Sequence, residues 1–196
     1  MGADRLDEVL DATYDCLTRY GVRRTTMDDI ASTMGVSRSA VYQYVRSKDD
    51  AFRQLAARLH DRALARARLA AAQDAPYAVR IRGVLAAKFD LVLDLSGPSP
   101  HTAGLLDQKA RLFGEIRTAF TRNLRCLLVG LFAEAGTAAG TEPGRAADIA
   151  IALVTGLESV HGGRELLAPA TGALLTGLLA TAPPATDHSL AVEPCQ

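Results

Sequence analysis

Arginine, glutamine and tyrosine gather in one short segment of this chain, and these residue types recognise nucleic acids. An Arg can pair bidentately with guanine and a Gln with adenine, while an Ala methyl can meet the methyl group of thymine. Tyr hydroxyls suit phosphate oxygens. On a helix over residues 38–45, the outward-pointing candidates for reading base edges are Arg38, Ser39, Ala40, Tyr42, Gln43 and Tyr44.

The charge around this segment suits contact with phosphates. The whole chain has a net charge of +0, with 22 Lys and Arg against 22 Asp and Glu, and as a bulk property this argues against DNA binding. From residue 23 to residue 48, however, five Lys or Arg face only Asp28 and Asp29. Phosphate contact requires only such a local concentration. We expect two phosphate anchors: Thr26, with the free amides of the helix that it begins, and Lys48.

Two short helices must position these side chains. Residues 27–34 form the first predicted helix, with Thr26 as its N-cap and Asp29 in capping-box spacing. Gly35 supplies the positive φ that a tight turn requires, and the second helix follows at 38–45. This pattern predicts a helix-turn-helix, whose second helix lies in the major groove. The apolar residues spaced to pack the two helices together are Ile30, Ala31, Val36 and Val41.

The same residues carry a family resemblance. The stretches YGVRRTTMDDIA, at 20–31, and MGVSRSAVYQYVRSKDD, at 34–50, closely resemble the TetR family of bacterial regulators. The resemblance covers about residues 5–60. It implies an all-α homodimer with an N-terminal DNA-binding domain and a C-terminal ligand-sensing domain. The implied function is a transcriptional repressor that binds a palindromic operator in double-stranded DNA and is released by a small-molecule effector.

The rest of the chain also favours helices. Apolar residues recur at helical spacing, β-branched residues form no alternating runs, and glycine or proline separates the segments. We predict an all-α fold of about nine helices: a helix-turn-helix domain at 1–50, a helical ligand-binding and dimerisation domain at 51–182, and a flexible tail at 183–196. The remaining expected helices are 5–20, 48–73, 76–95, 105–135, 145–167 and one opened by Pro169.

Arg117 is the first candidate for a ligand contact in the larger domain. It falls within the apolar stripe of the expected helix 105–135, where a charge usually needs a partner. It could bind an anionic ligand. A structural salt bridge, or a side chain long enough to reach solvent, is the commoner explanation for an Arg in such a position. Phe89, Phe113 and Phe120 could line a pocket, although such a set is more often ordinary core.

Glu158 and His161 are further candidates, with Glu165 four residues beyond. On one continuous helix all three share a face, which could form a metal site or a pH-sensitive polar cluster. Hydrogen bonding at a surface or an interface is the commoner role. The last two helices combine leucines with small residues, a composition suited to a two-fold four-helix dimer interface, although part of it must serve the intramolecular core.

The sequence gives less support to other classes of function. The sequence contains no Ser-His-Asp arrangement, P-loop, HExxH or glycine-rich dinucleotide motif, so we expect neither an enzyme nor a catalytic site. Three widely separated cysteines argue against a disulfide framework or a zinc cluster, and we expect no metal and no cofactor. The opening residues lack an apolar run, and no stretch suits a membrane span, so the expected location is cytoplasmic. The alternative is a helical ligand-binding protein with a degenerate DNA head.

Overall fold

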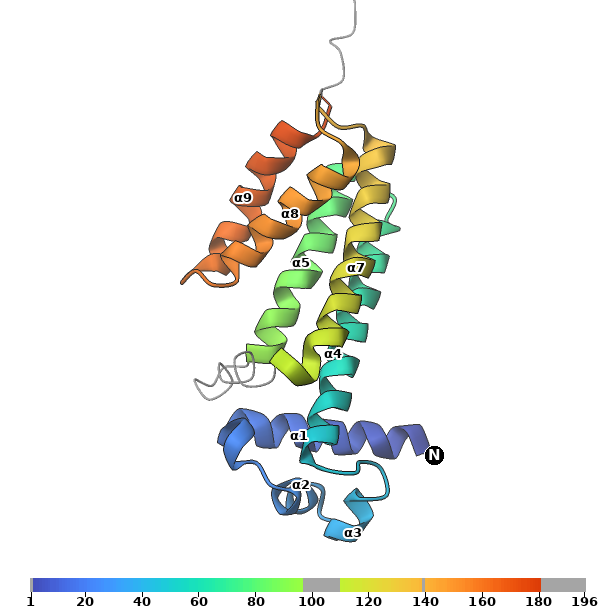
Figure 1. The fold of residues 1–196 in the computed structure, drawn as a ribbon, viewed down its shortest axis with the longest axis vertical. Helices are drawn as coiled ribbons and strands as arrows, with labels where there is room; N and C mark the ends of the chain where they lie inside the picture. The colour runs from blue at the N-terminus through green and yellow to red at the C-terminus, as the bar shows by residue number, and fades with distance from the viewer. Residues whose placement is uncertain (1, 97–109, 139, 181–196) are drawn as a thin grey trace, which may run out of the picture.

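The protein is an all-α molecule of two packed parts (Figure 1). A computed structural model describes residues 2–96, 110–138 and 140–180. Within these ranges there are eight helices, against about nine predicted, and the only β-type pairing is an isolated bridge between Thr137 and Leu179. The helices are α1 (Gly2–Arg24), α2 (Met27–Met34), α3 (Arg38–Val41), α4 (Lys48–Ala71), α5 (Tyr77–Ser96), α7 (Ala110–Ala135), α8 (Pro143–Leu157) and α9 (Gly163–Leu178).

The first three helices form a small unit with its own core. Gly21, at φ 76°, bends the end of α1, and Gly35, at φ 65°, is the left-handed residue between α2 and α3. Helix α3 has only four residues and ends at Val41, so the expected helix over 38–45 is shorter than predicted. The core of this unit contains the predicted packing residues Ile30, Ala31 and Val41, with Val36 packed against it.

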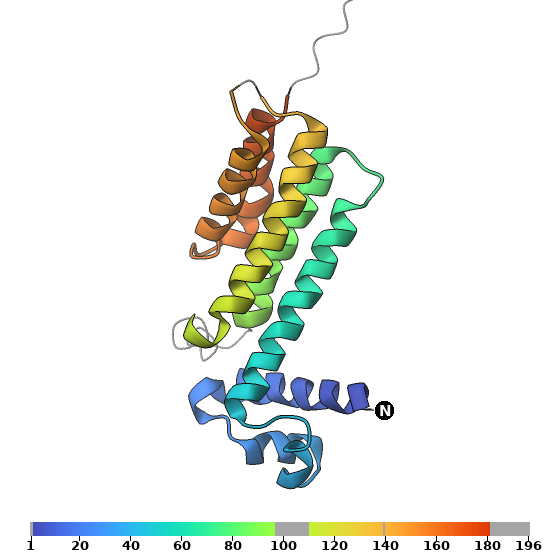
Figure 2. The ribbon, with the colours of Figure 1, turned by 45° about the vertical axis from the view of Figure 1, so that its right-hand side comes forward.

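Helix α4 joins the small unit to the larger bundle. Its first turns lie against α1, and the rest runs along one side of the bundle against α5 and α7 (Figures 1 and 2). The larger core accordingly contains Leu17 of α1 and Phe52 of α4 together with residues of α5, α7, α8 and α9. No helix of the described residues is long and apolar enough to cross a membrane.

The boundary between the last two helices differs from the prediction. The expected helices over 145–167 and from Pro169 onwards are replaced by α8, which ends at Leu157, and α9, which contains Pro169. The break is a reversal at Gly162 and Gly163. Gly162 has φ 74°, and a Cβ added to buried Gly163 would lie 2.1 Å from the carbonyl oxygen of Leu157. The two glycines therefore allow a close reversal that a larger residue would obstruct.

Candidate nucleic-acid interface and ligand cavity

Thr26 begins α2 with a complete capping box. Its Oγ1 accepts from the Asp29 amide at 3.2 Å, while Asp29 Oδ2 accepts from the Thr26 amide at 2.8 Å and from the Thr26 hydroxyl at 2.7 Å. These bonds satisfy donors that the first turn of a helix otherwise leaves unpaired. The Thr26 hydroxyl is thus engaged within the protein, and its contact with phosphate stays a prediction.

Replacing Thr26 by Ala removes the side-chain half of this capping box. We expect the free energy of unfolding to fall by about 1 kcal/mol, as is typical for loss of an N-cap. Thermal or urea denaturation followed by circular dichroism measures the change. Thr26→Ser is the matched control because it keeps the hydroxyl, and equal losses in the two variants would contradict the capping role.

Helix α3 presents its polar residues to solvent. Ser37 caps it by accepting from the Ala40 amide, and its hydroxyl also lies 2.9 Å from that of Ser39. Of the six predicted base-reading residues, Ala40 and Tyr44 are half-buried, and Tyr44 packs against the small core. The four that are exposed are Arg38, Ser39, Tyr42 and Gln43.

Arg38 already has partners in this structure. Its guanidinium donates to Oδ2 of Asp28 at 3.0 Å and to the Tyr42 hydroxyl at 3.2 Å, and it lies 5.5 Å from the centre of the Tyr42 ring. Both Arg38 and Asp28 are more than half exposed, so the pair is weak and its geometry can be exchanged for another partner. Asp28 is therefore a carboxylate that competes with any nucleic acid for Arg38.

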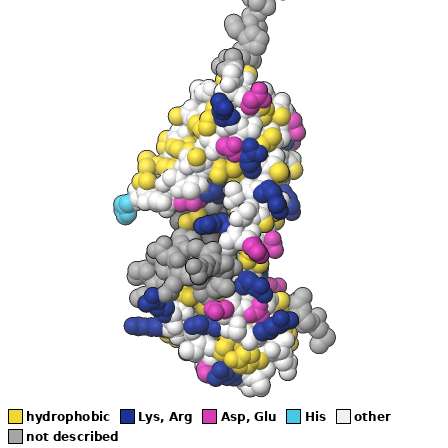
Figure 3. Space-filling view, viewed as in Figure 1, with side chains coloured by type: hydrophobic (Ala, Val, Ile, Leu, Met, Phe, Trp, Pro, Cys, Tyr) yellow, Lys and Arg dark blue, Asp and Glu magenta, His cyan; other side chains and the backbone are white. Residues whose placement is uncertain are grey.

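Lys48 connects the start of α4 to the end of α1. Its Nζ donates to the carbonyl oxygens of Val22 at 3.3 Å and Arg23 at 3.4 Å. An ammonium has three donors, so one remains for another acceptor. Close by, the Arg46 amide donates to Asp50 at 2.8 Å, and this bond holds the pKa of Asp50 below its ordinary value. Figure 3 shows Lys and Arg side chains over this end of the molecule, with Asp and Glu among them.

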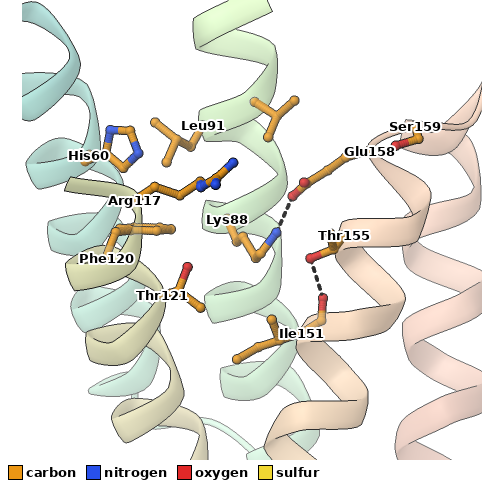
Figure 4. Close-up of a pocket in the computed structure, with 11 residues that line it drawn as sticks. His60, Lys88, Leu91, Arg117, Phe120, Thr121, Ile151, Thr155, Glu158 and Ser159 are labelled. Carbon is orange, nitrogen blue, oxygen red and sulfur yellow. Dashed lines mark hydrogen bonds and ion pairs between the residues drawn. The ribbon is translucent and has the colours of Figure 1, made fainter. Parts of the chain in front are cut away.

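A cavity of about 380 Å³ lies in the bundle between α4, α5, α7 and α8, and we call it the bundle cavity (Figure 4). This volume is near the lower end of the range of about 300–1,000 Å³ usual for small-molecule sites. Its apolar wall includes Leu91, Val92, Phe120 and Ile151. Its polar wall includes His60, Lys88, Arg117, Thr121, Thr155 and Glu158.

An ion pair crosses the bundle cavity. Nζ of Lys88 on α5 lies 2.5 Å from Oε1 of Glu158, the C-cap residue that follows α8. The Lys88 side chain is 10% exposed and that of Glu158 is 15% exposed, so both charges are largely removed from solvent. Removing either partner would leave the other charge largely buried and unpaired, which is strongly unfavourable.

His60 forms the α4 side of the cavity. Its Nδ1 lies 2.7 Å from the Ala56 carbonyl oxygen, and its ring meets that of Phe120 edge-on, with 5.4 Å between centres. Burial lowers the pKa of His60 below its ordinary value. The ring is therefore neutral at pH 7, with Nδ1 as the donor to the carbonyl and Nε2 left as an acceptor.

Comparison with known proteins identifies the first of these two regions. Residues 9–55 match the family model described as bacterial regulatory proteins, tetR family. By its N-terminal domain, the chain belongs to the TetR family. It is a TetR-family transcriptional regulator with a helix-turn-helix DNA-binding domain, which confirms the resemblance seen in the sequence. The comparison with curated proteins found no match.

Solved structures share the fold of the whole chain. SmeT, the repressor of the Stenotrophomonas maltophilia multidrug efflux pump SmeDEF, is 18% identical with a TM-score of 0.65, over 89% of this chain and 90% of SmeT. A TetR/AcrR-family regulator of Thermobifida fusca is 19% identical with a TM-score of 0.63, over 89% and 98%. The ketosteroid regulator KstR2 of Mycobacterium tuberculosis is 17% identical with a TM-score of 0.61, over 90% and 96%. At these identities the likeness establishes the TetR-like fold.

Only some of the ligand-binding residues predicted for this TetR-family chain line the bundle cavity. Arg117, Phe120 and Glu158 line the bundle cavity. Phe89 is buried in the core and is not among the residues that line the cavity. The side chain of Phe113 lies outside the described residues.

The predicted helical face of Glu158, His161 and Glu165 is wrong. Helix α8 ends at Leu157, His161 lies exposed in the reversal, and Glu165 belongs to the first turn of α9. No group of three or more His, Cys, Asp or Glu among the described residues could hold a metal ion. Glu158 instead pairs with Lys88 on another helix.

Sequence reasoning missed His60 and Lys88 as residues of the cavity. Lys88 interrupts the apolar run from Leu85 to Phe89, and this interruption was an available signal, since Lys is rarely buried unless it is paired. His60 had no comparable signal, because its position is a core position of α4 like its apolar neighbours.

Proposed function

We propose that this TetR-family regulator is a ligand-responsive repressor that binds a palindromic operator as a homodimer and is released by a small-molecule effector in the bundle cavity. In this proposal residues 1–50 bind DNA and residues 51–182 bind the effector and form the dimer. The observation that carries the proposal is that α4 touches both regions: Arg58 holds α1, and His60, two residues later, lines the bundle cavity.

The DNA contacts follow from the exposed surface of α3 and its surroundings. We assign base reading to Arg38, Ser39, Ala40, Tyr42, Gln43 and Tyr44, with the four exposed side chains making the main contacts. Thr26 and Lys48 are the proposed phosphate anchors. For Lys48 this uses the third donor of an ammonium that two backbone carbonyls already orient.

The proposed dimer forms through α8 and α9. Ile149, Val160 and Leu166 are among the large apolar side chains that the described part of one chain leaves exposed, at 39%, 49% and 45%. Figure 3 shows apolar side chains over these two helices. Exposed Gly156 and Gly177 would let a second pair of helices approach closely. Such a face suits a two-fold interface.

Arg58 gives the proposal a route from effector to DNA. Its guanidinium donates to Oδ1 of Asp7 at 3.0 Å, to the Asp7 carbonyl oxygen at 3.1 Å and to Oδ1 of Asp11 at 2.6 Å, and its side chain is only 12% exposed. A shift of α4 caused by a ligand beside His60 would therefore carry α1 with it. The two DNA-binding domains of a dimer must match half-sites about one turn of DNA apart, or a multiple of it. A small change in their separation therefore weakens DNA binding.

Selection from a random-sequence library tests this proposal. The full-length protein is incubated with random duplexes, and the bound duplexes are amplified and sequenced. We expect a palindromic sequence to be enriched, a dimer in sedimentation analysis, and an affinity that falls steeply as salt rises. If no sequence is enriched, the DNA-binding head is degenerate and the chain is a helical ligand-binding protein instead.

A further inference from the structure

We infer that the bundle cavity binds an organic carboxylate with a small apolar body. The inference deepens the proposed function and rests on it only for the regulatory consequence of binding. It is carried by the charges that line the cavity, by the position of Arg117, and by the apolar wall opposite.

The charges in the bundle cavity do not balance. At neutral pH the described lining residues with ionised side chains are Lys88, Arg117 and Glu158, because His60 is kept neutral by burial. Lys88 and Glu158 neutralise each other as an ion pair. Arg117 has no carboxylate partner among the described residues, so the cavity as described has one positive charge in excess. An anion supplied by a ligand removes this imbalance.

Arg117 is placed to bind such an anion. Its side chain extends from α7 across the cavity towards α5, with His60 on one side and the Lys88–Glu158 pair on the other (Figure 4). A guanidinium presents paired N–H donors whose geometry matches the two oxygens of a carboxylate. Because Arg117 forms no ion pair with the described residues, its N–H donors are free to bind and orient a ligand carboxylate.

The walls of the cavity indicate what the rest of the ligand is. Leu91, Phe120 and Ile151 offer an apolar surface. The Thr155 hydroxyl donates to the Ile151 carbonyl oxygen at 2.9 Å. Its one hydrogen is therefore used, and towards a ligand the hydroxyl can act only as a hydrogen-bond acceptor. With a volume of about 380 Å³, the cavity fits a small apolar body such as a medium-length alkyl chain.

A cationic ligand fits the cavity less well. Glu158 is the one carboxylate among the described residues of its wall, and the Lys88 ammonium already occupies it. A cation would have to displace Lys88, which would leave that ammonium unpaired and largely buried, or lie beside the positive charge of Arg117. Both arrangements are unfavourable.

Calorimetric titration of the full-length protein tests the inference with three probes of one chain length: decanoate, decanol and decylamine. We expect decanoate to bind more tightly than the other two. Arg117→Gln should weaken decanoate binding roughly ten- to a hundred-fold, as for loss of a hydrogen-bonded charge pair, and Arg117→Glu should weaken it further. Arg82→Gln is the matched control, because Arg82 is exposed on α5 and does not line the cavity.

The charge series also predicts the reverse order for decylamine, which should bind Arg117→Glu more tightly than the unchanged protein. The inference is overturned if decanol or decylamine matches decanoate on the unchanged protein, if decanoate does not bind, or if Arg117→Gln binds decanoate as the unchanged protein does. Arg117 is exposed, so its variants are expected to fold, and their circular dichroism spectra verify this.

Release of the enriched duplex separates this inference from the proposed function. Decanoate that binds through Arg117 but leaves the duplex bound supports the carboxylate site and contradicts the effector role. A duplex that is released by decylamine but not by decanoate supports an effector response and overturns the carboxylate site.

Discussion

Replacing Glu158 by Gln is expected to lower the free energy of unfolding by about 3 kcal/mol, the lower end of the range for breaking a buried ion pair. The change leaves the Lys88 ammonium without its counter-charge in a site where its side chain is only 10% exposed. The value lies at the lower end because neither side chain is fully buried, so solvent still reaches part of each charge. Urea denaturation at one fixed protein concentration measures the loss.

A double-mutant cycle distinguishes the ion pair from the packing of its two side chains. Lys88→Met together with Glu158→Leu removes both charges, and apolar replacement of a whole buried pair is often neutral for stability. We therefore expect the double variant to be more stable than either single variant of the cycle, Lys88→Met or Glu158→Leu. A double variant whose loss equals the sum of the two single losses would show that the charges do not interact.

Asp148 provides the matched control for this cycle. It forms a two-bond ion pair with Arg125 between α8 and α7, but the Asp148 side chain is 56% exposed and that of Arg125 is 46% exposed. Water screens such a pair, so Asp148→Asn should change stability little. A loss as large as that of Glu158→Gln would mean that burial does not explain the importance of Glu158.

Replacing Arg38 by Ala is expected to lower affinity for the enriched duplex roughly ten- to a hundred-fold, the usual range for a bidentate base contact. The reason is that Arg38 is an exposed guanidinium on α3, with partners that DNA can replace. Fluorescence anisotropy at several salt concentrations measures both the affinity and its dependence on salt. A base contact should relax sequence preference and leave the salt slope nearly unchanged, whereas a phosphate contact lowers the slope.

A change at Asp28 should have the opposite effect on DNA affinity. Asp28→Asn removes the carboxylate that binds Arg38 at 3.0 Å and also a negative charge beside the proposed DNA surface. We therefore expect it to raise the affinity several-fold, by a roughly Coulombic amount. Arg68→Ala is the control, because Arg68 is an exposed cation in the last turn of α4, far from α3. Equal losses in Arg38→Ala and Arg68→Ala would show that only net charge matters.

The helix-turn-helix could be predicted because its signals are local. Thr26 and Asp29 form a capping box over four residues, and Gly35 has the positive φ that the turn requires. Buried Ile30 and Val41 pack the two helices over a short separation along the chain. Each of these interactions is made by near neighbours, so residue types and spacing were sufficient to place them.

The reversal between α8 and α9 was mispredicted because two local signals conflicted. Pro169 predicts the start of a helix, yet it lies within α9, while Gly162 and Gly163 form the actual break. Proline at a helix start is only a tendency. The decisive feature is the 2.1 Å approach of the Leu157 carbonyl oxygen to the place of a Gly163 Cβ, a contact that residue types and spacing do not reveal.

The sequence by itself determined the all-α fold, the TetR-family head and the exposure of Arg38, Ser39, Tyr42 and Gln43 in and after α3, because these depend on periodicity, capping and neighbours close in the chain. Only the tertiary structure decided the bundle cavity. His60, Lys88, Arg117 and Glu158 come from four segments up to about a hundred residues apart, and no spacing relates them. Packing of α4, α5, α7 and α8 brings them together, pairs Lys88 with Glu158 and leaves Arg117 facing the cavity without a partner among the described residues.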